Sequence, residues 1–158
     1  MNLHKNPTDF RILITLTADY MHLPESAIER DYYIVLMLKK LSESDYVEKC
    51  VFKGGTSLSK CYPNSIERFS EDIDLTYLGM DESDNKCDKE LKRIEKLMTI
   101  TANTRKIESE RSPRNKSMYV WFDSEENKVK LEIGCSVRTD PYSKKRIKDI
   151  YSRISRNS

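Results

Sequence analysis

The sequence has few of the residues that hold a transition metal or build a nucleophilic triad. The 158 residues include only two histidines and four cysteines, which are His4, His22, Cys50, Cys61, Cys87 and Cys135. The cysteines lack CxxC spacing and have no histidine nearby, which argues against a zinc site and against Cys/His or Ser/His/Asp catalysis. In a reducing cytosol we expect each cysteine to be a small buried residue or a free surface thiol, and the histidines to serve surface or packing roles.

Long apolar runs are also missing. The run at residues 34–38 (IVLML) is among the longest, and it is far shorter than the ~20 residues that span a bilayer. The N-terminus lacks the basic stretch followed by an apolar stretch that marks a secretory signal. We therefore expect no transmembrane helix, no membrane partner and a cytoplasmic location.

Core-forming residues and charge are plentiful. Hydrophobic residues make up 37% of the chain, and 28 Lys and Arg against 26 Asp and Glu give a net charge of +2. A chain of this length buries roughly 68–70% of its unfolded surface, so we expect one domain over residues 1–158 with its own core.

Positive charge gathers at the C-terminus. Residues 143–158 carry six cations and one anion, a net charge of 6 − 1 = +5. Their apolar residues Ile147, Ile150, Tyr151 and Ile154 recur at helical spacing and predict a basic amphipathic helix. We expect its apolar side to dock on the domain or a partner, and its cations to face RNA, DNA or an acidic partner. A solvated helix face is the alternative.

Helical patterns occupy residues 1–46. A start signal at residues 7–9 precedes apolar positions at helical spacing, including Phe10, Leu13 and Met21, and these predict a first helix. Residues 25–44 predict a second helix with a buried stripe.

Short strands and helices follow in a predicted catalytic core, residues 47–134. The predicted strands are 47–52, 72–77, 118–122 and 129–133, and the predicted helices are 57–61, capped by Thr56, and 84–101. The last two strands form a hairpin, and the polar residues 103–115 are expected to form a mobile loop. The fold class is therefore α+β, a small mixed sheet flanked by helices.

Glycine is scarce as well, and its placement is informative. Two of only four glycines, Gly54 and Gly55, are adjacent where a predicted strand meets a predicted helix. Glycine allows a positive φ and close backbone approach, and a helix N-terminus offers free N–H groups to an anion. The pair is therefore either a phosphate-binding turn or an ordinary Gly-Gly turn.

Two carboxylates lie two residues apart on a predicted strand. Asp72 and Asp74 point to one face, while Ile73 and Leu75 enter the core. Like charges held together need a cation or a shared proton, and oxygen ligands favour magnesium or manganese. The alternative is a pair of solvated acids on an edge strand.

A third carboxylate has the same alternation. Glu132 lies between Leu131 and Ile133, so it leaves the core on a sheet face where it could join the aspartates. A surface glutamate is the alternative role, and Asp140 is a weaker substitute as third ligand.

These motifs together resemble a known family. Residues 52–60 (FKGGTSLSK) and 68–75 (RFSEDIDL) resemble the AbiEii/AbiGii abortive-infection toxin family of nucleotidyltransferases, and residues 28–33 (IERDYY) look like the family's preceding helix, with Arg30 where Lys is usual. The resemblance implies a polymerase-β-like nucleotidyltransferase core, a nucleoside triphosphate with Mg²⁺ or Mn²⁺, and a toxin beside a cognate antitoxin. The acceptor hydroxyl would belong to tRNA or to a protein.

The resemblance also assigns roles. Asp72, Asp74 and Glu132 would be the catalytic and metal-binding carboxylates. The expected nucleotide-binding residues are Lys53, Gly54, Gly55, Thr56, Lys60 and Ser70, with Ser70 supporting the glycine turn. Arg68 would contact phosphate or pair with Glu71.

One departure keeps a second reading open. Family members usually continue into a helical C-terminal region, which we expect to be absent because the sequence ends at Ser158. The alternative to an active enzyme is a truncated, non-catalytic module that binds nucleotide or antitoxin. A third possibility is general nucleic-acid binding through the basic segment.

Overall fold

The structure is a computed structural model that describes residues 3–61 and 71–135, with the backbone alone for residues 58–61. Its helices are η1 (Leu3–Lys5), α1 (Pro7–Met21), α2 (Glu25–Ser42), α3 (Gly54–Cys61), α4 (Asp84–Met98), η2 (Glu108–Glu110) and η3 (Glu125–Asn127). Its strands are β1 (Cys50–Lys53), β2 (Asp72–Tyr77), β3 (Asn103–Lys106), β4 (Asn115–Trp121) and β5 (Val129–Cys135). The predicted C-terminal helix and Asp140 lie outside the described residues.

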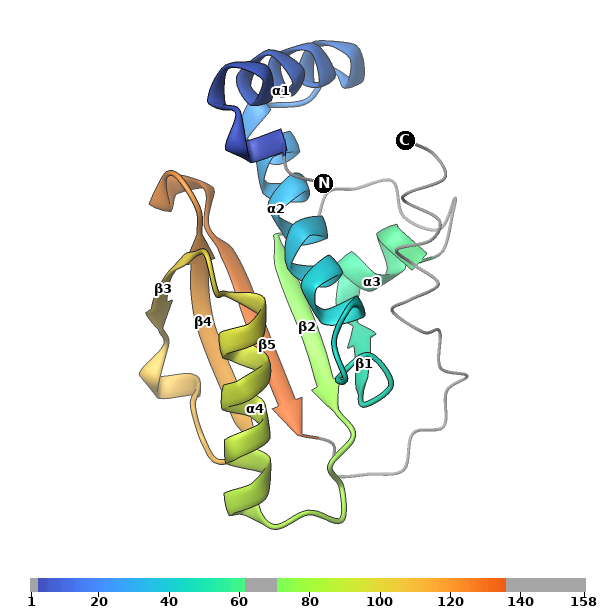
Figure 1. The fold of residues 1–158 in the computed structure, drawn as a ribbon, viewed down its shortest axis with the longest axis vertical. Coiled ribbons are helices and arrows are strands. Elements are labelled where there is room, and N and C mark those ends of the chain that lie inside the picture. Colours follow the sequence, from blue (N-terminus) through green and yellow to red (C-terminus); the bar gives the residue numbers. More distant parts are fainter. Residues whose placement is uncertain (1–2, 62–70, 136–158) are drawn as a thin grey trace.

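The strands form one mixed sheet. Their order is β1-β2-β5-β4-β3, with β2 and β5 parallel and the other pairs antiparallel (Figure 1). The sheet confirms the predicted α+β class, and the antiparallel pairing of β4 with β5 confirms the predicted hairpin.

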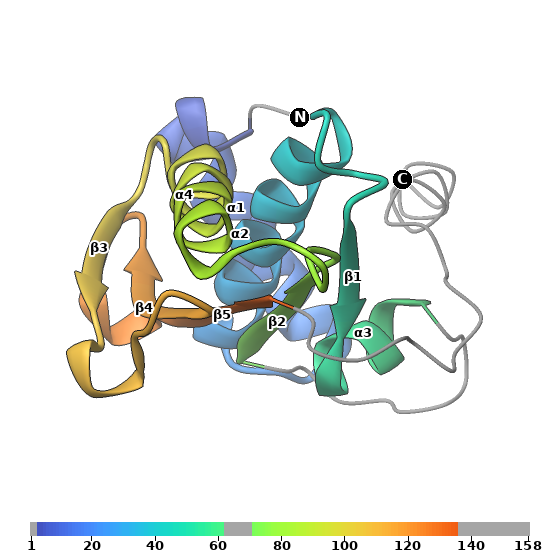
Figure 2. The ribbon, with the colours of Figure 1, turned by 90° about the horizontal axis from the view of Figure 1, so that it is seen from below.

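Helices α2 and α4 pack on one face of this sheet (Figure 2). Strand residues that alternate with charged ones, such as Ile73, Leu75 and Leu131, are fully buried against them. The charged residues between these positions therefore face the opposite side. Among the described residues, no helix is long and apolar enough to cross a membrane.

Helix α1 packs on the first turns of α2 through a second, smaller apolar cluster. Phe10, Ile14 and Ala18 are its buried contributions. The predicted helix is confirmed, but Leu13 and Met21 are each 45% exposed, because they lie outside the apolar cluster that α1 forms with the other described residues.

The predicted mobile loop at residues 103–115 is wrong. It contains β3, η2 and the first residue of β4. The guanidinium of Arg111, whose side chain is 10% exposed, donates to Glu95 of α4 through its two terminal nitrogens, at 2.7 and 3.2 Å, and to the carbonyl of Ser117 at 3.1 Å. This contact to a distant helix orders a segment whose local sequence is polar.

Two element boundaries also differ from prediction. Residues 45–49 form hydrogen-bonded turns, with Lys49 N–H donating to the Tyr46 carbonyl at 2.9 Å, so β1 begins only at Cys50. Helix α4 ends at Met98, so Thr101 lies beyond it.

Three of the four cysteines bear out the expected burial. Cys50, Cys87 and Cys135 are free and buried, and the Cys87 and Cys135 sulfurs lie 2.6 Å apart under the carbonyl of Gly79. Burial raises the pKa of Cys50 to about 12, which keeps it a neutral thiol.

The Arg111–Glu95 pair generates a stability prediction. Replacing Arg111 with Met leaves the Glu95 carboxylate buried without its partner, so the free energy of unfolding in urea should fall by about 3–5 kcal/mol. Arg93→Met is the matched control, because Arg93 is 66% exposed in its pair with Glu90 and its loss should cost less than about 1 kcal/mol. Equal costs for the two variants would contradict this account of the 103–115 segment.

Candidate active site

The glycine turn joins β1 directly to α3. Helix α3 begins at Gly54, three residues earlier than predicted, and Gly54 has a φ of 76°. A Cβ at this position would clash with the carboxylate of Asp74, so the backbone lies against that side chain. Glycine is required here both by its conformation and by this close approach.

Hydroxyl groups of the first turn of α3 fasten the turn to the sheet. Thr56 is 1% exposed, and its hydroxyl donates a hydrogen bond to the carbonyl of Asp72. The Ser57 hydroxyl donates to the carbonyl of Phe52 at 3.0 Å. Thr56 is therefore inside α3, and its prediction as the N-cap is wrong. Its hydroxyl proton is used within the protein, so its expected phosphate contact now falls to its backbone N–H and stays a prediction.

Strand register brings the three predicted carboxylates onto one face. In the parallel pair, Asp74 lies opposite Glu132, and Asp72 lies opposite Lys130. The antiparallel partner β1 places Lys53 opposite Asp74. We call Asp72, Asp74 and Glu132 the carboxylate face.

Electrostatics on this face reflect crowded negative charge. Partial burial raises the pKa of both aspartates, and Glu132 raises each further. Lys130 opposes the increase at Asp72, and Lys53 opposes it at Asp74. At strand spacings of about 5–7 Å, each carboxylate pair repels by about 2–3 kcal/mol at an effective dielectric near 20, before solvent screening.

Lys130 is the main counter-ion of the carboxylate face. Its ammonium lies 2.5 Å from Glu132 and 2.8 Å from Glu110 of η2, and these carboxylates raise its pKa. Neither Lys130 nor Glu110 is among the site residues predicted from the sequence. The sequence could have indicated Lys130, because it lies two residues before Glu132 on the same strand and so faces the same side. Nothing in the sequence around Glu110 indicates a role in the site, because it lies in the segment predicted to be a loop.

The donor set suits a hard divalent cation, but the side chains are not arranged around one. Asp72, Asp74 and Glu132 offer carboxylate oxygens alone, which magnesium and manganese prefer. Within the described residues, no three acidic, histidine or cysteine side chains converge as a ready metal site. The Glu132 carboxylate is instead directed to Lys130.

The remaining predicted residues divide into two groups. Lys53 is exposed at the end of β1, and Arg30 of α2 pairs with Glu71 immediately before β2. Ser70 and Arg68, like the side chain of Lys60, lie outside the described residues, so their roles stay predictions.

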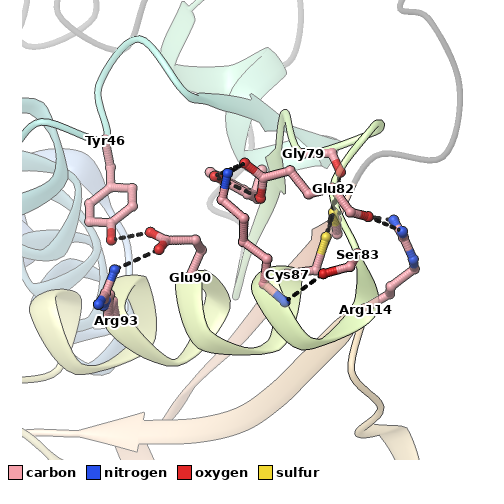
Figure 3. A network of polar contacts seen from close by, with 11 residues as sticks. Tyr46, Gly79, Glu82, Ser83, Cys87, Glu90, Arg93 and Arg114 are labelled. Atoms are coloured by element: carbon pink, nitrogen blue, oxygen red, sulfur yellow. Dashed lines mark hydrogen bonds and ion pairs between the residues drawn. The ribbon is translucent and has the colours of Figure 1, made fainter.

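A second polar hollow lies on the opposite side of the sheet, beside α4. It is lined by residues that include Tyr46, Tyr77 and Glu90. Tyr46 donates to Glu90 at 2.6 Å, and Arg93 pairs with the same carboxylate at 2.6 Å (Figure 3). These groups satisfy one another, so the carboxylate face is the better candidate.

The chain is also similar to known proteins. The profile of one family, described as nucleotidyl transferase AbiEii toxin of a type IV toxin–antitoxin system, matches residues 36–157, which include the glycine turn and all five strands. No curated protein matches the chain.

Several solved structures match the chain, MenT4 and JHP933 among them. MenT4, a nucleotidyltransferase toxin from Mycobacterium tuberculosis H37Rv, has 20% identity and a TM-score of 0.55, over 79% of this chain and 44% of MenT4. JHP933 from Helicobacter pylori has 20% identity and a TM-score of 0.48, over 75% of this chain and 48% of JHP933. The chain thus spans less than half the length of either protein, and the likeness to MenT4 shows a shared fold.

The glycine turn yields a prediction about packing. Gly54→Ala should lower the free energy of unfolding by about 1–3 kcal/mol, because it combines a strained positive φ with a clash against Asp74. Gly134→Ala is the control, since its added Cβ would meet only Asn115 Oδ1, at 3.6 Å. In an Asp74→Ala background, Gly54→Ala should lower the free energy of unfolding in urea by less than it does in the wild type, because the clash is then removed. If the cost of Gly54→Ala is the same in both backgrounds, the Asp74 side chain is not in close contact with the turn.

Crowding of the carboxylates yields a prediction about pH. With EDTA present, Asp74→Asn should melt at a higher temperature than the wild type at pH 7, by roughly 2–4 °C for each kcal/mol of repulsion removed. Because the folded pKa of Asp74 is raised, the wild type loses stability as pH rises through that pKa, and the variant does not lose it there. The difference in melting temperature between Asp74→Asn and the wild type should therefore shrink as pH falls from 7 to 3.5. A difference that grows instead would contradict the prediction.

Proposed function

The chain belongs to the AbiEii family of nucleotidyl transferase toxins of type IV toxin–antitoxin systems, and we propose that it transfers a nucleotide from a nucleoside triphosphate to a hydroxyl acceptor. One observation supports this most strongly: Asp74, which lies opposite Glu132 in the pairing of β2 with β5, also has its carboxylate against the backbone of the glycine turn. Candidate metal ligands and a candidate phosphate-binding backbone are thus adjacent.

The nucleotide would bind at the start of α3. Gly54 and Gly55 would let backbone N–H groups approach the β- and γ-phosphates, with the N–H of Thr56 beside them. Lys53, opposite Asp74, would offset phosphate charge, and Lys60 and Ser70 complete the proposed set.

The carboxylates would hold Mg²⁺ or Mn²⁺. When bound, these ions would neutralise charge on the triphosphate and on the oxygens of an in-line displacement. Asp72 and Asp74 would each present a carboxylate to the ions from β2, and Glu132 would complete the ligand set from β5. Glu132 would also accept the proton of the attacking hydroxyl.

Partners follow from the family. We propose a tRNA or protein acceptor, a cognate antitoxin and a cytoplasmic setting, and we assign the basic residues 143–158 to acceptor binding.

Label transfer tests this proposal directly. The chain would be incubated with each α-³²P-labelled nucleoside triphosphate, Mg²⁺ and either total tRNA or a bacterial protein extract. We expect covalent label on one acceptor, and a loss of at least about 100-fold in Asp72→Asn and Asp74→Asn, which remove ligand charge at constant size. The exposed Asp81→Asn is the matched control and should retain the wild-type rate.

Two other results would overturn the proposal. Label that binds to filters without covalent transfer would favour the nucleotide-binding module instead. Transfer that survives both aspartate substitutions would place the chemistry elsewhere in the chain.

A further inference from the structure

Lys130 occupies the position that decides whether Glu132 is available as a ligand. Its ammonium contacts Glu132 at 2.5 Å and lies across the strand pair from Asp72. A divalent cation held by the carboxylate face would draw on the same Glu132 carboxylate, whose Oε1 contacts the ammonium. The ion pair and the metal therefore compete for one carboxylate.

Glu110 is placed to hold Lys130 whether or not Glu132 is engaged. It contacts the ammonium at 2.8 Å from η2, outside the carboxylate face. Its backbone N–H donates to the Ile107 carbonyl at 3.0 Å, and its own carbonyl accepts from Asn115 at 2.7 Å. Glu110 is thus a fixed partner, held by its own turn and by Asn115 of β4.

We propose that Lys130 is a movable counter-ion of the carboxylate face and that Glu110 is the positioning residue that draws it off Glu132 when a divalent cation binds. The proposal rests on the proposed metal site and adds its regulation. Without metal, Lys130 bridges Glu110 and Glu132 and relieves the repulsion among the carboxylates. With metal, the Lys130–Glu132 contact is lost, and Glu110 alone keeps the ammonium paired.

Charge balance gives the direction of the effect. If Glu110 is neutral, Glu132 is the one ion-pair partner of Lys130 that remains among the described residues, so metal binding at Glu132 takes that partner away. Removing Glu110 therefore weakens metal binding through Lys130. Simple loss of a nearby negative charge would also weaken it, so the two effects must be separated by a control and a double variant.

Thermal melts with MnCl₂ at fixed ionic strength give the measurement, and the readout is the Mn²⁺ concentration that produces half of the maximal rise in melting temperature. The variants are Glu110→Gln, Lys130→Met and the double variant. Glu108→Gln is the matched control, because it removes the same charge from the same turn and Glu108 forms no ion pair with Lys130 among the described residues. Melts in EDTA establish that each variant is folded.

We expect Glu110→Gln to raise the half-effect concentration about three- to tenfold, and Glu108→Gln to change it less than about 1.5-fold. Lys130→Met should lower it. In the Lys130→Met background, Glu110→Gln should have no effect, because there is no ammonium left to hold. An Mn²⁺ response seen in Lys130→Met but not in the wild type would also support the proposal.

Two outcomes would overturn the proposal, and they can be told apart. An Mn²⁺ response in the wild type with equal effects of the Glu108 and Glu110 substitutions, or with a Glu110 effect that persists without Lys130, would reject the role of Glu110 alone. No Mn²⁺ response in either the wild type or Lys130→Met would reject the proposed metal site, and this inference with it.

Discussion

The parallel register of β2 on β5 is the constraint from which the arrangement of the site follows. Ile73, Leu75, Leu131 and Ile133 are fully buried beneath α2 and α4, and they fix the two strands relative to each other. A slip of one residue would send the charged side chains into the core. Apolar packing on one face thus holds like charges together on the other, where they would otherwise separate.

Compensation for that crowding is spread over the structure. Lys53 comes from β1 and Lys130 from β5, and Lys130 connects the face to Glu110. The 103–115 segment that supplies Glu110 is itself held to α4 by the buried Arg111–Glu95 pair. The local electrostatics of the site therefore depend on a tertiary contact on the α4 side of the sheet. The same contact explains why the polar segment 103–115 is ordered.

Alternation in the sequence was enough to predict the carboxylate face, because a strand with period two exposes Asp72, Asp74 and Glu132 whatever lies around it. The adjacent glycines predicted a turn at the join of a strand and a helix where a positive φ is allowed, and Gly54 has a φ of 76°. Long-range contacts could not be predicted this way. The strand β3 depends on pairing with β4, and the hydroxyl of Thr56 binds a carbonyl 16 residues away.

The central claim is that the carboxylate face and the glycine turn form one site for a metal-bound nucleotide. Crystals grown with Mn²⁺ and a non-hydrolysable nucleoside triphosphate, measured at the manganese absorption edge, test it most directly. The account predicts an anomalous peak within about 2.0–2.4 Å of oxygens of Asp72 and Asp74, with the triphosphate along residues 54–56. A nucleotide bound elsewhere, or manganese away from both aspartates, would contradict it.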